Sequence, residues 1–161
     1  PAHLNAELFK SMAGVDIFHI SYKGTAPAIT ALLAGQTQIM FNETGGIAGH
    51  VKAGKLKALA VTSATPSALF PALPTIAASG LPGYELVGIT GFHAPAKTAP
   101  AIITRINQEI VRVLNRPEIK DRFLEAGVET VGGSPEQFAA TIKSDTSKIA
   151  KLIKDVDIKP D

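Results

Sequence analysis

The stretch HISYKGTAPAITALLAGQTQIMFNE, residues His19 to Glu43, decides the fold that this sequence predicts. A β-prone run enters it, and Gly24 interrupts that run. Thr25 follows at the position expected for a helix N-cap, and apolar residues at helical spacing predict a helix over 27–34. Thr37 to Phe41 then form a second β-prone run. The stretch therefore predicts a strand, a helix and another strand in succession.

A strand–helix–strand unit of this length is most simply a right-handed βαβ crossover. The loops that follow its two strands then open at the same edge of a parallel sheet. Ligands bind at this edge in open α/β proteins. Tyr22 to Ala26 and Asn42 to Thr44 occupy these two loops.

The composition narrows the class of protein. The chain has 161 residues, a net charge of +2 and no cysteine. This length predicts one domain or two small lobes, and the lack of a basic block argues against nucleic-acid binding. The absence of cysteine excludes disulfides and suits an exported protein. We find neither a membrane-spanning run nor a signal peptide, but a helix that starts at Pro1 predicts that residues were removed upstream.

The rest of the chain predicts more helix than strand. Ser134 and Gln137 have the spacing of a capping box, which predicts the start of a long helix ending near Val156. Residues 95–161 have too few strands for a sheet of their own. They therefore predict an incomplete lobe whose other strands lie in a missing segment or in another chain. Further helices are expected at 2–13, 47–53, 75–78, 101–114 and 118–126, and strands at 15–22, 56–62, 84–94 and 128–131.

Several stretches match one family in its own order. They are YKG at 22–24, LLAGQ at 32–36, VKAGKLKALAVTS at 51–63, LPGYE at 81–85 and VGGSPEQF at 131–138. With this combination the sequence resembles the solute-binding receptors of tripartite tricarboxylate transporters, the Bug-type periplasmic receptors.

The resemblance implies an α/β fold. It consists of a periplasmic-binding-protein-like (type II) lobe with βαβ units, plus the C-terminal helical part of an incomplete second lobe. Residues 1–84 would form the ligand-binding lobe, 85–94 the interlobe crossing strand, and 95–161 the C-terminal part of the other lobe. Family members close two lobes on a small carboxylate and deliver it to a membrane permease. The resemblance thus implies a periplasmic, N-terminally truncated receptor with no cofactor and no enzymatic activity.

The chemistry that this implies is anion capture at helix N-termini. Their free N–H groups and the positive end of the helix dipole hold a carboxylate without a counter-charge. Two such ends are expected at the cleft, one on the first helix and one on the crossover helix. The candidate ligand-binding residues, by resemblance and by position at this edge, are Ala2, His3, Tyr22, Lys23, Gly24, Thr25, Ala26, Asn42, Glu43 and Thr44.

Each candidate also has a purely structural interpretation. Gly24 and Thr25 are needed for the turn and the helix start in any case, and Lys23 could be a solvated loop cation. The Asn42 amide could donate a hydrogen bond to a carboxylate. Glu43 would repel a carboxylate, so it is expected to point away or to bind an amine or hydroxyl group.

Other function classes have less support in the sequence. His19, His50 and His93 are too scattered for a metal site, and Ser21 and Ser63 lack the context of a nucleophile elbow. One alternative is a small α/β enzyme or regulatory module that binds a carboxylate or phosphate with the same loops. Another expectation is a homodimer or segment exchange through the incomplete lobe. The identity of the ligand remains open.

Overall fold

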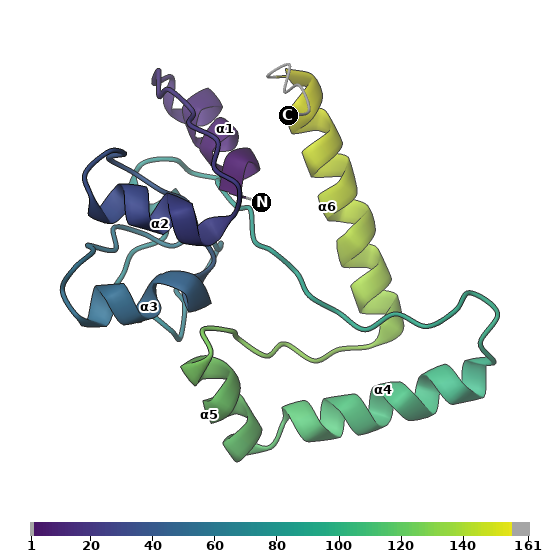
Figure 1. The fold of residues 1–161 in the computed structure, drawn as a ribbon. Helices are drawn as coiled ribbons and strands as arrows, with labels where there is room; N and C mark the ends of the chain where they lie inside the picture. The colour runs from purple at the N-terminus through teal and green to yellow at the C-terminus, as the bar shows by residue number, and fades with distance from the viewer. Residues whose placement is uncertain (1, 156–161) are drawn as a thin grey trace. The chain divides into compact units, whose positions relative to one another are not determined.

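The computed structural model describes residues 2–155. The chain divides into two compact units, Pro1–Gly88 and Ile89–Asp161, and each is described by itself. The assignment of residues 1–84, 85–94 and 95–161 to lobes and crossing strand stays a prediction. Unit 1 holds α1 (Ala2–Ala13), α2 (Thr25–Leu33), α3 (Thr44–Lys52) and the 3-10 turn η1 (Ala77–Ser79), and unit 2 holds α4 (Pro100–Leu114), α5 (Pro117–Glu125) and α6 (Pro135–Asp155) (Figure 1).

The segments expected as strands run without a hydrogen-bonded ladder within residues 2–155. This corrects the strands predicted at 15–22, 37–41, 56–62, 84–94 and 128–131. An isolated parallel bridge joins Val61 to Thr75; the Val61 N–H donates to Pro74 O (2.9 Å) and the Ile76 N–H donates to Val61 O (3.0 Å). A β-prone pattern favours extended backbone, but a strand also needs a neighbour at hydrogen-bonding distance. Phe18 belongs to such a β-prone run. Its side chain is 88% exposed, because no paired strand among the described residues covers it.

Helix positions were predicted well, but three helix starts need correction. The short helix predicted at 75–78 is the 3-10 turn η1, which starts at Ala77. The N-cap of α2 is Gly24 and not Thr25, which is the first helical residue. Gly24 has φ 104°, a conformation that disfavours residues with a Cβ. The helix predicted at 47–53 is α3, and it starts three residues earlier at Thr44. Residues 156–161, which include the predicted end of the last helix, lie outside the described residues.

Tyr84, from the LPGYE stretch, is the most deeply buried large side chain among the described residues, at 1% exposure. Its hydroxyl donates to the backbone oxygen and to Oδ1 of Asn5 in α1, at 3.0 Å each. The Phe9 ring lies edge-on to it at 6.5 Å, and Phe9 also contacts Phe41 at 5.8 Å. This aromatic cluster fastens α1 to the extended segments of unit 1.

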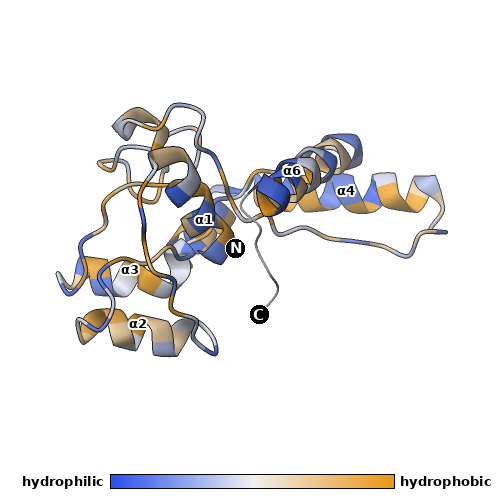
Figure 2. Cartoon of the chain, turned by 90° about the horizontal axis from the view of Figure 1, so that it is seen from above, coloured by the Kyte–Doolittle hydropathy of each residue, from blue (hydrophilic) through white to orange (hydrophobic). Residues whose placement is uncertain are grey.

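Unit 2 confirms the predicted capping box at the start of α6. The Gln137 N–H donates to Ser134 Oγ (3.2 Å), and the Ser134 N–H donates to Gln137 Oε1 (2.8 Å). The pKa of the Glu136 carboxyl is lowered by a hydrogen bond from the same Ser134 hydroxyl and by one from the backbone of Glu136 itself. Asn107 Nδ2 of α4 donates to Gly133 O at 2.7 Å, which holds the segment before α6 beside α4. Figure 2 shows the hydrophobic and hydrophilic residues that alternate along α4.

Gly91 packs against the Phe138 ring of α6, so we expect Gly91→Ala to displace that ring and to destabilise the chain by about 0.5–1.5 kcal/mol. A Cβ at this position would lie 2.2 Å from Cζ and 2.6 Å from Cε1 of Phe138. Urea unfolding followed by circular dichroism measures the effect. Gly49→Ala is the matched control, because Gly49 lies inside α3 with nothing within 4 Å of its Cβ position. It should be neutral or stabilising, and an unchanged urea midpoint for Gly91→Ala would contradict the packing argument.

Candidate functional site

Helices α1, α2 and α3 begin on the same side of unit 1 (Figures 1 and 2). None of the three has an acidic residue in its first turn. Their free N–H groups and positive dipole ends are therefore not neutralised from within the helices. This side of unit 1 presents helix N-termini to an anion, and Glu43, the N-cap residue of α3, is the acidic residue beside them.

The starts of α2 and α3 lie in direct contact. A Cβ built on Gly46, in the first turn of α3, would lie 3.5 Å from Cγ2 of Thr25 and 3.0 Å from Nδ2 of Asn42. Glycine at this position therefore allows the close approach. The structure brings Thr25 and Asn42 together at Gly46, although α2 and the extended segment after it separate these residues in the sequence.

Asn42 contributes an unusual donor at this point. Its Nδ2 is buried and has no hydrogen-bond partner in the part of the chain that the structure describes. A buried donor without an acceptor costs roughly 1–3 kcal/mol. An acceptor oxygen from a bound molecule would remove that cost, and a carboxylate oxygen is a strong acceptor.

The start of α1 is linked to the same region through two histidines. The rings of His3 and His19 stack with centroids 4.0 Å apart and planes 14° apart. His3 Nε2 also lies 3.8 Å from Glu7 Oε1, and Glu7 accepts a hydrogen bond of 3.0 Å from Lys10 Nζ. This contact holds the segment that leads into α2 against the first turn of α1, where Ala2 and His3 lie.

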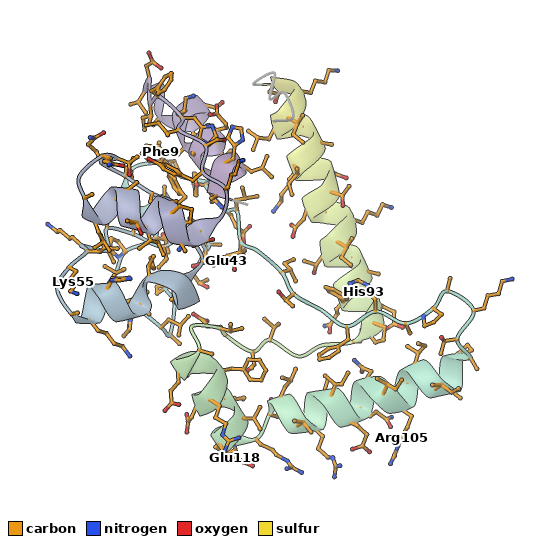
Figure 3. All side chains as sticks on the ribbon, viewed as in Figure 1. Phe9, Glu43, Lys55, His93, Arg105 and Glu118 are labelled. Atoms are coloured by element: carbon orange, nitrogen blue, oxygen red, sulfur yellow. The ribbon has the colours of Figure 1, made fainter. Side chains whose placement is uncertain are left out.

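The loop before α2 is closed by its own backbone. The Gly24 N–H donates to Tyr22 O at 2.8 Å, and Lys23 at the apex of this turn is exposed. Glu43, the N-cap residue of α3, is exposed as well, and its Oε1 would lie 3.7 Å from a Cβ on Gly88. Figure 3 shows Glu43 at the start of α3.

Two features of this region were missed by the sequence analysis. Gly45 and Gly46 precede the helix expected at 47–53, but in the structure they form the first turn of α3 and add a third helix N-terminus. The sequence signal was weak, since glycine disfavours a helix interior. His19 was weighed only as a metal ligand, and its stacking on His3 needs the tertiary structure to be seen.

Residues 2–155 contain no group of three or more His, Cys, Asp or Glu side chains that could hold a metal ion. No helix among them has both the length and the apolar character needed to cross a membrane.

Solved structures of periplasmic binding proteins share the fold of this chain. The structure of Rpa4515 from R. palustris with adipate aligns with a TM-score of 0.86 and 33% identity, over 99% of this chain and 53% of that chain. The structure of the periplasmic binding protein BugD aligns with a TM-score of 0.77 and 32% identity, over 98% of this chain and 54% of that chain.

The chain belongs to the tripartite tricarboxylate transporter family of receptors, whose sequence pattern matches residues 1–158. A relative from Pseudomonas sp. strain P51, the UPF0065 protein in the tcbD-tcbE intergenic region, is 35% identical over 152 residues. These findings confirm the family resemblance and the fold class. Because the family is one of receptors, they also favour the non-enzymatic interpretation over the enzyme alternative.

The chain spans about half the length of the relatives that it matches. The alignment covers 94% of this chain but 45% of the Pseudomonas relative. This agrees with the interpretation of the sequence as part of a two-lobed receptor.

Proposed function

We propose that this chain forms part of a periplasmic receptor that captures a small organic carboxylate. One carboxylate group would be bound by the first-turn N–H groups of α2 and α3 and by Asn42 Nδ2. The observation that carries the proposal is the meeting of two helix starts beside a buried donor that has no protein acceptor among the described residues. Tyr22, Lys23, Gly24, Thr25, Ala26, Glu43 and Thr44 border this position, and Ala2 and His3 lie at the start of α1.

The ligand class and the delivery step rest on similarity. The similar R. palustris receptor was solved with adipate, a dicarboxylate. The family description names a tripartite tricarboxylate transporter. The bound carboxylate would accordingly be handed to the membrane permease of such a transporter in the periplasm. A receptor of this kind buries its ligand between two lobes, so the intact gene product is the form that should bind.

Calorimetric titration of the intact gene product tests the proposal. The panel contains adipate, succinate, malate, citrate and benzoate, with hexane-1,6-diol as an uncharged partner to adipate. We expect at least one carboxylate to bind with micromolar or tighter affinity and the diol to give no heat of binding. A folded protein that binds none of the acids would contradict the proposal.

We also propose that unit 2 associates with a second chain when the protein consists of these residues only. Several of its apolar side chains are exposed, among them Val131 at 93% and Phe92 at 76%. Exposed apolar surface of this kind favours association. Light scattering is expected to give a mass above that of the monomer, and a clean monomer at high concentration would count against a homodimer or segment exchange.

A further inference from the structure

A second concave surface of unit 1 lies at the other end of α3. It is a groove with a volume of 380 Å³ and a predominantly apolar lining. Val51 near the end of α3, residues 56–58 and residues 69–73 form its walls. Figure 3 shows Glu43 and Lys55 at opposite ends of α3. The helix has 9 residues, so these ends lie about 13 Å apart.

The local backbone fixes one wall of this groove. Gly54, with φ 66°, ends α3 in a Schellman motif. In it the Lys55 N–H donates to His50 O (2.9 Å) and the Gly54 N–H donates to Val51 O (3.0 Å). This turn directs the chain from α3 into residues 55–57, so that Leu56 and Lys57 line the groove and Lys55 directly precedes them.

The charge around the groove has one sign. Between Glu43 and Glu85 the sequence contains no acidic residue, but it contains Lys52, Lys55 and Lys57. All three lysines are exposed. Across residues 2–155 none of the three has an ion-pair partner. Lys52 also lies in the last turn of α3, where it interacts favourably with the helix dipole. The dipole gives Lys52 a structural role, and Lys55 and Lys57 lie beyond the end of the helix.

From this combination we infer that the groove docks a protein segment that carries a bulky apolar side chain flanked by carboxylates. The apolar walls would bury the side chain, and Lys55 and Lys57 would pair with the acidic flanks. Apolar anchors in a pocket supply most of the affinity of such contacts, and rim charges supply orientation and association rate. The groove is separate from the anion site at the start of α3, so a partner could dock while the anion site is occupied.

The intact gene product, labelled with ¹⁵N, is titrated with the peptide Glu-Asp-Phe-Leu-Glu-Asp, which is blocked at both ends. One comparison peptide has Lys in place of the acidic residues, and another has Ser in place of Phe and Leu. We expect the first peptide alone to shift the amide signals of residues 51, 56–58, 69, 70, 72 and 73. The dissociation constant should rise at least about tenfold in Lys55→Glu/Lys57→Glu.

Lys143→Glu/Lys151→Glu on α6 is the matched control, because it changes the net charge equally at exposed positions that do not line the groove. It should bind the peptide within about twofold of the unmodified chain, since rim contacts act locally at ordinary salt. Equal weakening in both double variants, or shifts confined to residues outside the groove, would overturn the inference. Binding of phosphatidylglycerol vesicles through Lys55 and Lys57 without peptide binding would overturn it too, since the surface would then contact lipid.

Discussion

Thr25→Asp is expected to weaken adipate binding by the intact gene product about 100-fold without destabilising the fold. Thr25 is the first residue of α2 and lies beside Gly46 and Asn42. A carboxylate at this position would lie within about 5 Å of a bound one, and the repulsion at an effective dielectric constant near 20 is about 3 kcal/mol. The same negative charge at a helix start stabilises the helix by roughly 0.3–1 kcal/mol. Binding and stability should therefore change in opposite directions.

Ala101→Asp in the first turn of α4 is the control for this variant. It places the same charge at a helix start in unit 2, so it should affect helix stability similarly and leave adipate affinity within about twofold. Calorimetry gives the affinities and thermal unfolding gives the stabilities. If Thr25→Asp binds adipate as tightly as the unmodified protein, the start of α2 does not contact the ligand.

The largest loss of stability is expected for Tyr84→Ala, at about 3–5 kcal/mol. This substitution removes the ring that contacts Phe9 and the hydroxyl that donates to both Asn5 oxygens. Tyr84→Phe keeps the ring and should cost less, about 1–3 kcal/mol, because only the hydroxyl is lost. Urea unfolding of both variants separates the contribution of the ring from that of the hydrogen bonds. Equal losses for the two would show that the ring contributes little.

Burial also makes Tyr84 sensitive to high pH. It raises the pKa of the Tyr84 phenol, so the folded chain retains this proton when the unfolded chain releases it near pH 10. The unfolded state then binds fewer protons, and stability falls as the pH rises above about 10. Tyr84→Phe should lack this contribution, so the difference between the two proteins should shrink at high pH.

The sequence predicted the helices because their signals are local. Ser134 and Gln137 specify the start of α6 by themselves, and their reciprocal hydrogen bonds are present. Strands could not be predicted in the same way, since a strand forms only when it pairs with a neighbour that is often distant in the chain. Val61 illustrates this, because it forms a bridge to Thr75, which lies in a later segment of the chain. Gly24 as N-cap was misjudged because side-chain preference favoured Thr25, whereas the backbone there needs a positive φ.

The candidate site was predicted as a set of loops, and its geometry needed the structure. Tyr22 to Ala26 and Asn42 to Thr44 were expected at one sheet edge, and the starts of α2 and α3 do lie together. The role of Gly46 depends on how closely two helices approach, which no local pattern encodes. The unpartnered donor of Asn42 likewise follows from burial by residues distant in the sequence.

The central claim is that the starts of α2 and α3 hold a carboxylate. Its most direct test is a ¹H–¹⁵N NMR titration of the intact gene product with adipate, or with the tightest ligand from the calorimetric panel. We expect the amide signals of Thr25, Ala26, Thr44, Gly45 and Gly46, and the Asn42 side-chain amide, to shift and saturate together. Saturable binding that leaves all of these signals in place would contradict the claim.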